Sequence, residues 1–174
     1  VEGLRPTPER LRETLFNWLG GDAAGLRCLD LFAGTGALGL EAASRGADFV
    51  LLNEFNRSAH AQLQKSLALL KSRQGGEHLP CEVRQQDALT LLKNWQGQAF
   101  DLIFLDPPFG QEALYLQALS AISAAKLAQA AIYLEANRQW QSAEIASLGW
   151  QVAKHSKVGA VHGHLLRPGV LGAA

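Results

Sequence analysis

The chain has 174 residues, of which 48% are hydrophobic, and its 16 basic and 16 acidic residues give a formal net charge of zero. This size and composition predict one domain with a full hydrophobic core. A neutral chain does not bind nucleic acid through overall charge, so any polyanionic partner must be bound by a local patch. Its apolar runs are too short to span a membrane, no signal peptide is visible, and Cys28 and Cys81 match no metal-ligand spacing. These features favour a cytoplasmic protein.

The predicted elements begin with a helix near the amino end of the chain. Thr7 is predicted as its N-cap and Pro8 as its first helical residue, and Gly20-Gly21 ends it. Apolar runs and helical periodicity then alternate along the chain. The predicted elements follow in this order: strand 28–32, helix 37–45, strand 49–53, a helix through Leu63, Leu67 and Leu70, strand 81–85, helix 88–94, strand 100–105, helix 114–122, strand 131–134, a helix around 140–148, strand 150–158 and strand 161–166.

Strands that alternate with helices predict a parallel sheet with helices on both faces, the doubly wound α/β class. The last two strands are joined only by Gly159-Ala160, which leaves no room for a crossover helix. They are therefore expected to pair antiparallel at one edge of the sheet. The span 1–174 is predicted as a single domain, in which residues 1–20 form an amino-terminal helix and lid segment.

Gly34, Gly36 and Gly39 have the spacing Gly-x-Gly-x-x-Gly between a predicted strand and a predicted helix. Glycines let the backbone turn tightly and approach a ligand, and the helix N-terminus offers free N–H groups. A dinucleotide enzyme would bind a pyrophosphate there and place an acid on a ribose about twenty residues later. Glu54 satisfies that spacing, so the turn by itself does not decide which ligand it serves.

Three acids lie at the ends of the first three predicted strands. Asp30 suits the cationic amino-acid end of S-adenosylmethionine, whereas it would repel a pyrophosphate; a structural role in fixing the turn is the alternative, and both can coexist. Glu54 is expected to accept both ribose hydroxyls, and the alternative is a solvated helix cap. Asp87 is expected to receive the adenine amino group beside the Ala88 N–H, or to be the N-cap of the following helix.

Asp106-Pro107-Pro108-Phe109 directly follows the most hydrophobic predicted strand. Ligands of open α/β sheets bind outside the carboxyl ends of the strands, so this motif is expected at the same crevice as the glycine turn. Asp106 and the Pro107 carbonyl are two acceptors that can hold an exocyclic amino group and aim its lone pair at a methyl sulfonium. The two prolines stiffen the backbone, and Phe109 can stack on a base. The alternative is a proline-containing loop with an aspartate cap.

The two motifs together resemble class I S-adenosylmethionine-dependent methyltransferases that act on nucleobase amines, whose signature is Asn or Asp, two prolines and an aromatic residue. More of the chain resembles the bacterial 16S ribosomal RNA guanine-N2 methyltransferases of the RsmD family. The residues that carry this resemblance are Leu4-Arg5-Pro6-Thr7, Arg10, the stretches 12–19 and 29–42, Glu54-Phe55-Asn56-Arg57, Asp106-Pro107-Pro108-Phe109 and the terminal hairpin.

The resemblance implies a seven-stranded Rossmann-like fold, S-adenosylmethionine as cofactor and S-adenosylhomocysteine as product. It implies methylation of one guanine of 16S ribosomal RNA, in an assembled or partly assembled 30S subunit. A monomer is expected, since nothing in the sequence demands more, and an in-line methyl transfer requires no metal. Family members usually begin with a basic, glycine-rich segment that is absent before Val1 here. The lid residues implied are Arg5, Pro6, Thr7 and Arg10. The catalytic residues are Asp106, Pro107, Pro108 and Phe109, and the cofactor-binding residues are Asp30, Phe32, Ala33, Gly34, Thr35, Gly36, Glu54, Phe55, Asp87, Ala88 and Asp106.

Two other functions stay open on the sequence. An adenine-N6 or cytosine-N4 DNA methyltransferase would use the same chemistry, although such enzymes must flip the base out of a duplex and no target-recognition domain is visible. A NAD-dependent oxidoreductase would use the glycine turn for its dinucleotide.

The five histidines are predicted to form no compact constellation. His162 and His164 share one face of a strand and are expected beside solvent or RNA rather than at a metal. The tryptophans are expected to pack in the core, and three cations of the last hairpin are expected to contact either phosphate or solvent. These residues are His60, His78, His155, His162 and His164; Trp18, Trp95, Trp140 and Trp150; and Lys154, Lys157 and Arg167.

Overall fold

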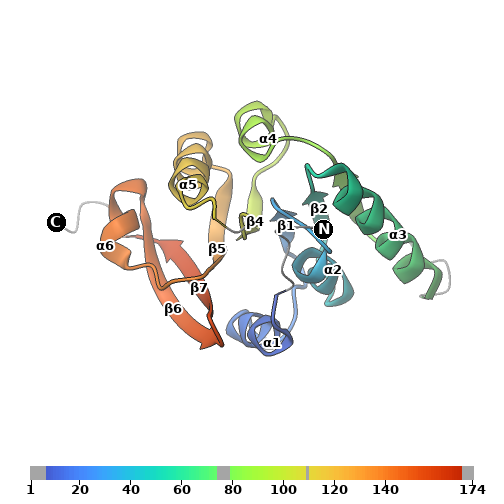
Figure 1. The fold of residues 1–174 in the computed structure, drawn as a ribbon, viewed down its shortest axis with the longest axis horizontal. Helices are drawn as coiled ribbons and strands as arrows, with labels where there is room; N and C mark the ends of the chain where they lie inside the picture. Colours follow the sequence, from blue (N-terminus) through green and yellow to red (C-terminus); the bar gives the residue numbers. More distant parts are fainter. Residues whose placement is uncertain (1–6, 74–78, 109, 170–174) are drawn as a thin grey trace.

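The computed structural model describes residues 7–73, 79–108 and 110–169. Strands and helices alternate along the chain as far as the final hairpin (Figure 1). The elements are α1 (Glu9–Trp18), β1 (Arg27–Asp30), α2 (Ala37–Ser44), β2 (Phe49–Asn53), α3 (Arg57–Arg73), β3 (Cys81–Arg84), α4 (Ala88–Asn94), β4 (Phe100–Leu105), α5 (Ala113–Ala125), β5 (Ala128–Ala136), α6 (Ser142–Ile145), the 3-10 turn η1 (Ala146–Leu148), β6 (Trp150–Val158) and β7 (Val161–Pro168).

The seven strands form one sheet in the order β3-β2-β1-β4-β5-β7-β6. The pairs from β3 to β5 are all parallel, whereas β7 is antiparallel to both β5 and β6. The predicted doubly wound α/β sheet with an antiparallel carboxyl-terminal hairpin is therefore confirmed. Because the order reverses between β1 and β4, the loops after these two strands diverge to opposite faces of the sheet and leave a crevice at its carboxyl edge.

Helices cover both faces of the sheet, and the sheet separates two hydrophobic cores (Figure 1). Helices α1, α2 and α3 pack on one face, and α4, α5 and α6 on the other. Strand residues alternate between the two cores, as period-two side chains must: Leu29 and Leu31 face α4 and α5, while Cys28 faces α1 and α2. The core to which a strand residue belongs therefore shows which face of the sheet its side chain occupies.

Several predicted boundaries change in the structure. The N-cap position of α1 is Pro8 and carries no side-chain cap, so the prediction of Thr7 as N-cap is wrong. The Thr7 hydroxyl instead donates to the Glu135 carboxylate, 128 residues away. The helix expected around 140–148 is a single turn, α6, followed by η1, because Gly149 (φ 89°) ends it before β6.

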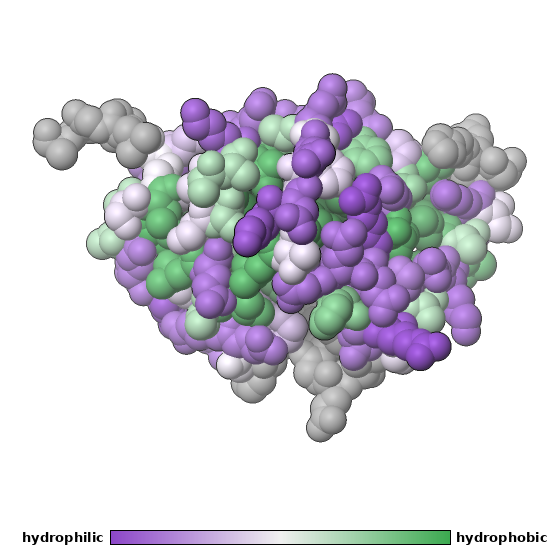
Figure 2. All heavy atoms as spheres, turned by 90° about the horizontal axis from the view of Figure 1, so that it is seen from above, coloured by the Kyte–Doolittle hydropathy of each residue, from purple (hydrophilic) through white to green (hydrophobic). Residues whose placement is uncertain are grey.

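Viewed from the side of α4 and α5, the surface mixes hydrophilic and hydrophobic residues (Figure 2). Within the described residues, no helix is both long and apolar enough to cross a membrane.

Candidate active site

The glycine turn after β1 is held by hydrogen bonds from its own chain. The Ala33 N–H donates to the Asn53 carbonyl at 2.8 Å, and the Gly36 N–H donates to the Ala33 carbonyl at 2.7 Å. Gly36 has φ 85°, and a Cβ there would lie 2.6 Å from the Leu63 side chain. Glycine is required at this position both by the backbone conformation and by the contact with α3.

Glu54, the residue after β2, fixes the turn from a second strand. One carboxylate oxygen accepts the Gly34 N–H and the other accepts the Asn56 N–H, both at 2.8 Å. The side chain is buried, so the alternative of a solvated cap is wrong. Each carboxylate oxygen keeps a second lone pair, which leaves acceptor capacity for a ligand hydroxyl.

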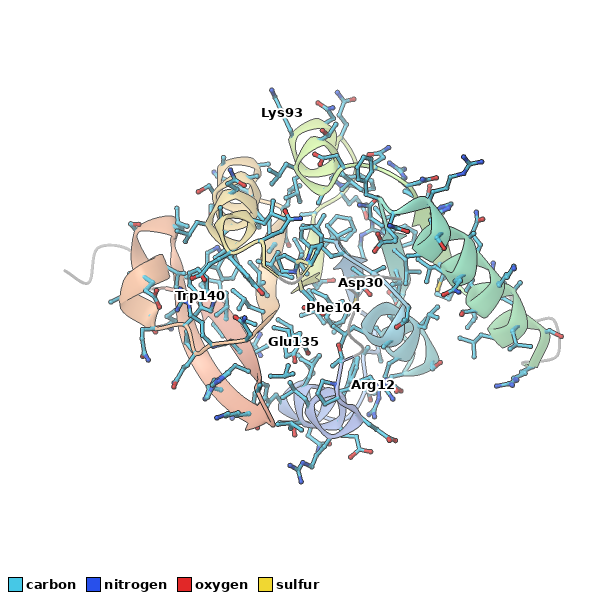
Figure 3. All side chains as sticks on the ribbon, in the orientation of Figure 1. Arg12, Asp30, Lys93, Phe104, Glu135 and Trp140 are labelled. Carbon is cyan, nitrogen blue, oxygen red and sulfur yellow. The ribbon has the colours of Figure 1, made fainter. Side chains whose placement is uncertain are left out.

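Asp30, the last residue of β1, is buried and accepts the Gly39 N–H of α2 at 2.9 Å. Its structural role in fixing the turn is therefore present. Burial raises the pKa of Asp30 to about 7; the Gly39 N–H opposes this shift, and the charges of Glu54 and Glu135 add to it. Figure 3 shows Asp30, Phe104 and Glu135 in the middle of the molecule. Asp30 and Glu135 are thus two buried acids on β1 and β5, the strands on either side of β4, and burial makes full charge costly at Asp30.

These bonds bear on which ligand the turn can take. The N–H groups of Ala33, Gly34, Gly36 and Gly39 already have partners within the chain. Two of those partners are carboxylates, Glu54 and Asp30, which repel an anion. A pyrophosphate would need free N–H groups at this turn. The two carboxylates beside the turn therefore favour a ligand that carries positive charge.

A cavity of about 500 Å³ opens at the carboxyl edge of β1, β2 and β3, against the start of α4 and α5. Six predicted site residues line it: Phe32, Glu54, Phe55, Asp87, Ala88 and Pro108. Its other lining residues were not predicted: Leu31, Asn53, Asn56, Gln86, Leu89, Gln111 and Leu114. Phe55 is 64% exposed, which is unusual for a large aromatic side chain and leaves one of its ring faces available to a flat ligand.

Asn53 is the most informative of the missed residues. Its amide donates to the carbonyls of Leu31 and Gln86, at 3.3 and 2.9 Å, and its oxygen accepts the Gln86 N–H at 3.1 Å. It thereby ties together the chain segments that follow β1 and β3. A polar residue closing the otherwise apolar strand Phe49–Asn53 was the available signal in the sequence.

Asp87 is the N-cap of α4, because its carboxylate accepts both the Thr90 N–H and the Thr90 hydroxyl at 3.0 Å. The N-cap alternative is therefore confirmed. Asp87 also lines the cavity, together with the buried Ala88. A capping carboxylate on the cavity wall can still accept from a ligand amino group through its remaining lone pairs.

The Asp106-Pro107-Pro108 segment follows β4 directly, at the same edge of the sheet. Asp106 is half-buried, Pro107 is buried, and Pro108 is exposed and lines the cavity. The Leu105–Leu134 pairing of β4 with β5 places Asp106 level with Glu135. Phe109 lies outside the described residues.

A buried polar network, which sequence reasoning missed, lies beside Asp106. The Tyr133 hydroxyl donates to one Glu135 carboxylate oxygen at 2.9 Å, and the Thr7 hydroxyl donates to the other at 3.3 Å. Burial, followed by the charge of Glu135, raises the pKa of Tyr133 well above its usual value. Among the predicted lid residues, Thr7 is held against β5 by its hydrogen bond to Glu135. Arg10 is exposed on α1, and Arg5 and Pro6 lie outside the described residues.

Three histidines gather on the final hairpin, so the prediction that the histidines form no compact constellation is wrong. His155 Nε2 lies 2.8 Å from His162 Nδ1, and both rings are half-buried. His164 is fully buried; its Nε2 accepts the Trp140 N–H at 2.9 Å, which leaves its hydrogen on Nδ1, 3.0 Å from the Leu134 carbonyl. Burial lowers the pKa of His164 to about 4. In the described ranges, no three His, Cys, Asp or Glu side chains are arranged to hold a metal ion.

Comparison with known proteins places this fold and site in a family. Ribosomal RNA small subunit methyltransferase D of Haemophilus influenzae is 48% identical over 109 residues, which are 62% of this chain and 54% of that protein. The protein of the same name from Buchnera aphidicola subsp. Baizongia pistaciae is 32% identical over 165 residues, or 93% of this chain and 80% of that protein. The chain spans about half the length of the first curated relatives it matches.

Solved structures agree on the fold, which is that of class I methyltransferases. A putative methyltransferase from Escherichia coli superposes with a TM-score of 0.76 at 31% identity, covering 95% of this chain and 89% of that one. A magnesium protoporphyrin IX methyltransferase from Synechocystis, solved with bound S-adenosylhomocysteine, has a TM-score of 0.68 at 16% identity, covering 91% and 82% of the two chains, and shows the shared fold alone.

The family described as conserved hypothetical protein 95 matches residues 1–167 of the chain. Together with the relative that aligns along nearly the whole sequence, this match shows that the chain belongs to that family, the RsmD family.

Proposed function

We propose that this chain transfers a methyl group from S-adenosylmethionine to the exocyclic N2 amine of a guanine in 16S ribosomal RNA. Its membership of the RsmD family supports the proposal, as do relatives named ribosomal RNA small subunit methyltransferase D. The proposal places the whole activity in one domain spanning residues 1–174, which acts as a monomer in the cytoplasm. The proposed substrate is an assembled or partly assembled 30S subunit.

The cavity lining suits the nucleoside end of S-adenosylmethionine, and the glycine turn suits its amino-acid end. Phe32 and Leu89 supply apolar wall for an adenine, while Glu54 and Asp87 supply acceptors for ribose hydroxyls and for an amino group. Asp30 lies at the glycine turn, where a cationic amino-acid end would offset the cost of its buried charge. When bound, this cofactor supplies an electrophilic methyl group on a sulfonium.

The protein's own part in the transfer is positioning. The Asp106 carboxylate and the Pro107 carbonyl accept the two hydrogens of the target amine, which draws its nitrogen out of conjugation and aims the lone pair. Pro107 and Pro108 fix the backbone, so these acceptors need no reorganisation during the reaction. Phe109 is proposed to stack on the guanine. In this scheme no side chain acts as a nucleophile: the N–CH3 bond forms as the sulfonium–methyl bond breaks, and the methylated amine then loses its extra proton to water.

One observation carries the proposal: Pro108 of the Asp-Pro-Pro segment lines the same cavity as Glu54 and Asp87. The acceptors for an amine therefore adjoin the acceptors for a nucleoside cofactor. A hydride-transferring enzyme has no use for acceptors that hold an amine, and the Glu54 and Asp30 carboxylates beside the glycine turn would repel a pyrophosphate.

The test is transfer of labelled methyl from S-adenosylmethionine to 30S subunits that lack the modification, followed by nucleoside analysis. Label in N2-methylguanosine is the expected result. Asp106→Ala should abolish transfer while S-adenosylhomocysteine binding, measured by calorimetry, stays within about twofold. Asp106→Asn should retain transfer, because its amide oxygen still accepts.

Asp48→Asn is a matched control, since Asp48 is exposed and lies before β2, at the opposite edge of the sheet. It should behave like the unsubstituted chain in both assays. Label in N6-methyladenosine or N4-methylcytidine would contradict the guanine assignment. Tight binding of NAD without binding of S-adenosylhomocysteine would contradict the methyltransferase proposal as a whole.

A further inference from the structure

The turn end of the β6–β7 hairpin carries a polar surface that does not line the cavity. His155, Lys157 and His162 lie on the same face of the two strands, because His155 pairs with His164 and Lys157 pairs with His162. The same face carries Leu134 and Leu166, which belong to the core under α5 and α6. Lys157 is exposed and the two imidazoles are half-buried. We call these three residues the hairpin triad.

The two imidazoles present hydrogen-bond donors to solvent in a fixed arrangement. His155 Nε2 and His162 Nδ1 share one hydrogen bond at 2.8 Å, and the rings stack with centroids 5.1 Å apart. Whichever ring donates that bond, the neutral pair keeps one outward N–H and one bare nitrogen. These outer nitrogens, His155 Nδ1 and His162 Nε2, have no hydrogen-bond partner among the residues that the structure describes. Uptake of one proton by the imidazole pair would make both of these outer nitrogens hydrogen-bond donors.

The charges around the triad are positive or already paired. On this face, burial lowers the pKa of both His155 and His162. The charge of Lys157 adds to the shift at His155, and His155 followed by Lys157 adds to it at His162. From the packed loop and from α6, Arg138 and Glu144 approach His164. Arg138 pairs with both Glu112, at 2.8 Å, and Glu144, at 3.0 Å. A phosphate would therefore meet a cation and N–H donors here, and the nearby acids are already paired.

The geometry of the imidazoles excludes a metal ion, the obvious alternative ligand. Two nitrogens at 2.8 Å, already hydrogen-bonded, would have to separate to bind one metal ion. The third ring, His164, uses both nitrogens on Trp140 and Leu134. The triad thus fits an oxyanion rather than a cation.

The triad also lies near the proposed reaction site. His162 pairs with Ala136, and Asp106 is level with the adjacent Glu135. The backbones of His162 and Asp106 are therefore two strand spacings apart, or roughly 10 Å at about 4.8 Å each. A backbone phosphate of a nucleotide next to a base held at Asp106 can span that separation.

We propose that the hairpin triad binds a backbone phosphate of the substrate RNA beside the target nucleotide, with Lys157 and the His155–His162 pair as its donors. This inference rests on the proposed RNA substrate. It also explains how a chain of zero net charge holds a polyanion, since a local patch replaces overall charge. Because the phosphate favours the protonated imidazole pair, RNA binding takes up a proton and tightens as the pH falls.

The test compares Lys157→Gln with Lys154→Gln. Lys154 is an exposed cation of the same strand, but it pairs with Leu165 on the opposite face, so it is a matched control. Unmodified 16S ribosomal RNA in 30S subunits serves as the probe, both in direct binding at several salt concentrations and in methyl transfer. Lys157→Gln should weaken RNA binding about fivefold to tenfold and raise KM without changing kcat. It should also reduce the slope of log affinity against log salt by about one.

A second variant reports on the imidazoles. His162→Gln should remove most of the change in RNA affinity between pH 5.5 and 7.5 that the unsubstituted chain shows. S-adenosylhomocysteine binding should stay unchanged in all three variants. Equal RNA affinity and equal salt slope for Lys157→Gln and Lys154→Gln would overturn the triad while leaving the methyltransferase proposal intact. Loss of methyl transfer to RNA by the unsubstituted chain, with cofactor binding retained, would instead overturn the proposed substrate.

Discussion

Two buried groups give the folded chain opposite responses to pH. The pKa of Asp30 is raised by burial from 3.8 to about 7, so between these values the folded state holds a proton that the unfolded chain has lost. Stability from this group is fully present below pH 4 and is lost as the pH rises through 7. The pKa of His164 is lowered by burial from 6.5 to about 4, so its contribution is present above pH 6.5 and is lost as the pH falls through 4.

The two contributions to stability are similar in size and opposite in sign, so they nearly cancel. One pKa unit corresponds to about 1.4 kcal/mol. The free energy of unfolding therefore changes by about 4 kcal/mol through the titration of Asp30, and by about 3 kcal/mol through that of His164. Between pH 4 and 6.5 the two slopes are equal and opposite, and the unsubstituted chain should show little pH dependence from these groups. Asp30→Asn removes only the decrease in the free energy of unfolding with rising pH that is due to Asp30. The free energy of unfolding of that variant should rise by about 3 kcal/mol, relative to the unsubstituted chain, from pH 4.5 to 6.5.

The assay is urea unfolding followed by tryptophan fluorescence at several pH values in this window. The substitution has a further, pH-independent effect through the new buried amide, so the slope is the quantity that tests the argument. His164→Asn should show the opposite slope, losing stability relative to the unsubstituted chain as the pH rises. Parallel pH profiles for the unsubstituted chain and Asp30→Asn would refute the reasoning, because they would mean that Asp30 titrates alike in the folded and unfolded states.

Two further predictions concern packing and polar contacts near the site. Gly39→Ala should destabilise the chain by about 1–3 kcal/mol in urea unfolding, because its Cβ would lie 2.6 Å from the Leu52 side chain and 2.9 Å from the Asp30 carboxylate; unchanged stability would show that α2 shifts freely away from β1. Tyr133→Phe should cost about 1–3 kcal/mol by removing a donor from the buried Glu135 carboxylate, and should lower the thermal midpoint without changing kcat; a raised midpoint would contradict the role assigned to that bond.

The parts of the fold that depend on local pattern could be predicted from the sequence. Apolar runs and helical periodicity gave the order of strands and helices, and Gly159-Ala160 was too short for anything but a hairpin. The N-cap role of Asp87 was also available, since it depends on the neighbouring Thr90. Cavity residues such as Phe32 and Glu54 were found because carboxyl ends of parallel strands share one edge.

The features that were missed depend on partners far apart in the chain. Thr7 resembles an N-cap locally, but its hydroxyl finds Glu135 across the fold. The histidine cluster instead follows from the Gly159-Ala160 turn, which pairs His155 with His164 and Lys157 with His162, and it was missed because the predicted hairpin pairing was not extended to its side chains. A strand position says which face a residue takes only when the register is known.

The buried acids at the glycine turn also predict how the proposed cofactor, S-adenosylmethionine, binds. Asp30 faces the repulsion of Glu54 and Glu135, and a cationic amino-acid end would relieve it. Binding of S-adenosylhomocysteine should therefore lower the pKa of Asp30 and release close to half a proton at pH 7, since a group whose pKa is about 7 is roughly half-protonated there. Calorimetry in buffers of different ionisation enthalpy measures this release. Methylthioadenosine, which has no amino-acid end, is the control and should release none. Equal release by both ligands would assign the proton to the nucleoside contacts instead, and would remove the cationic end from Asp30.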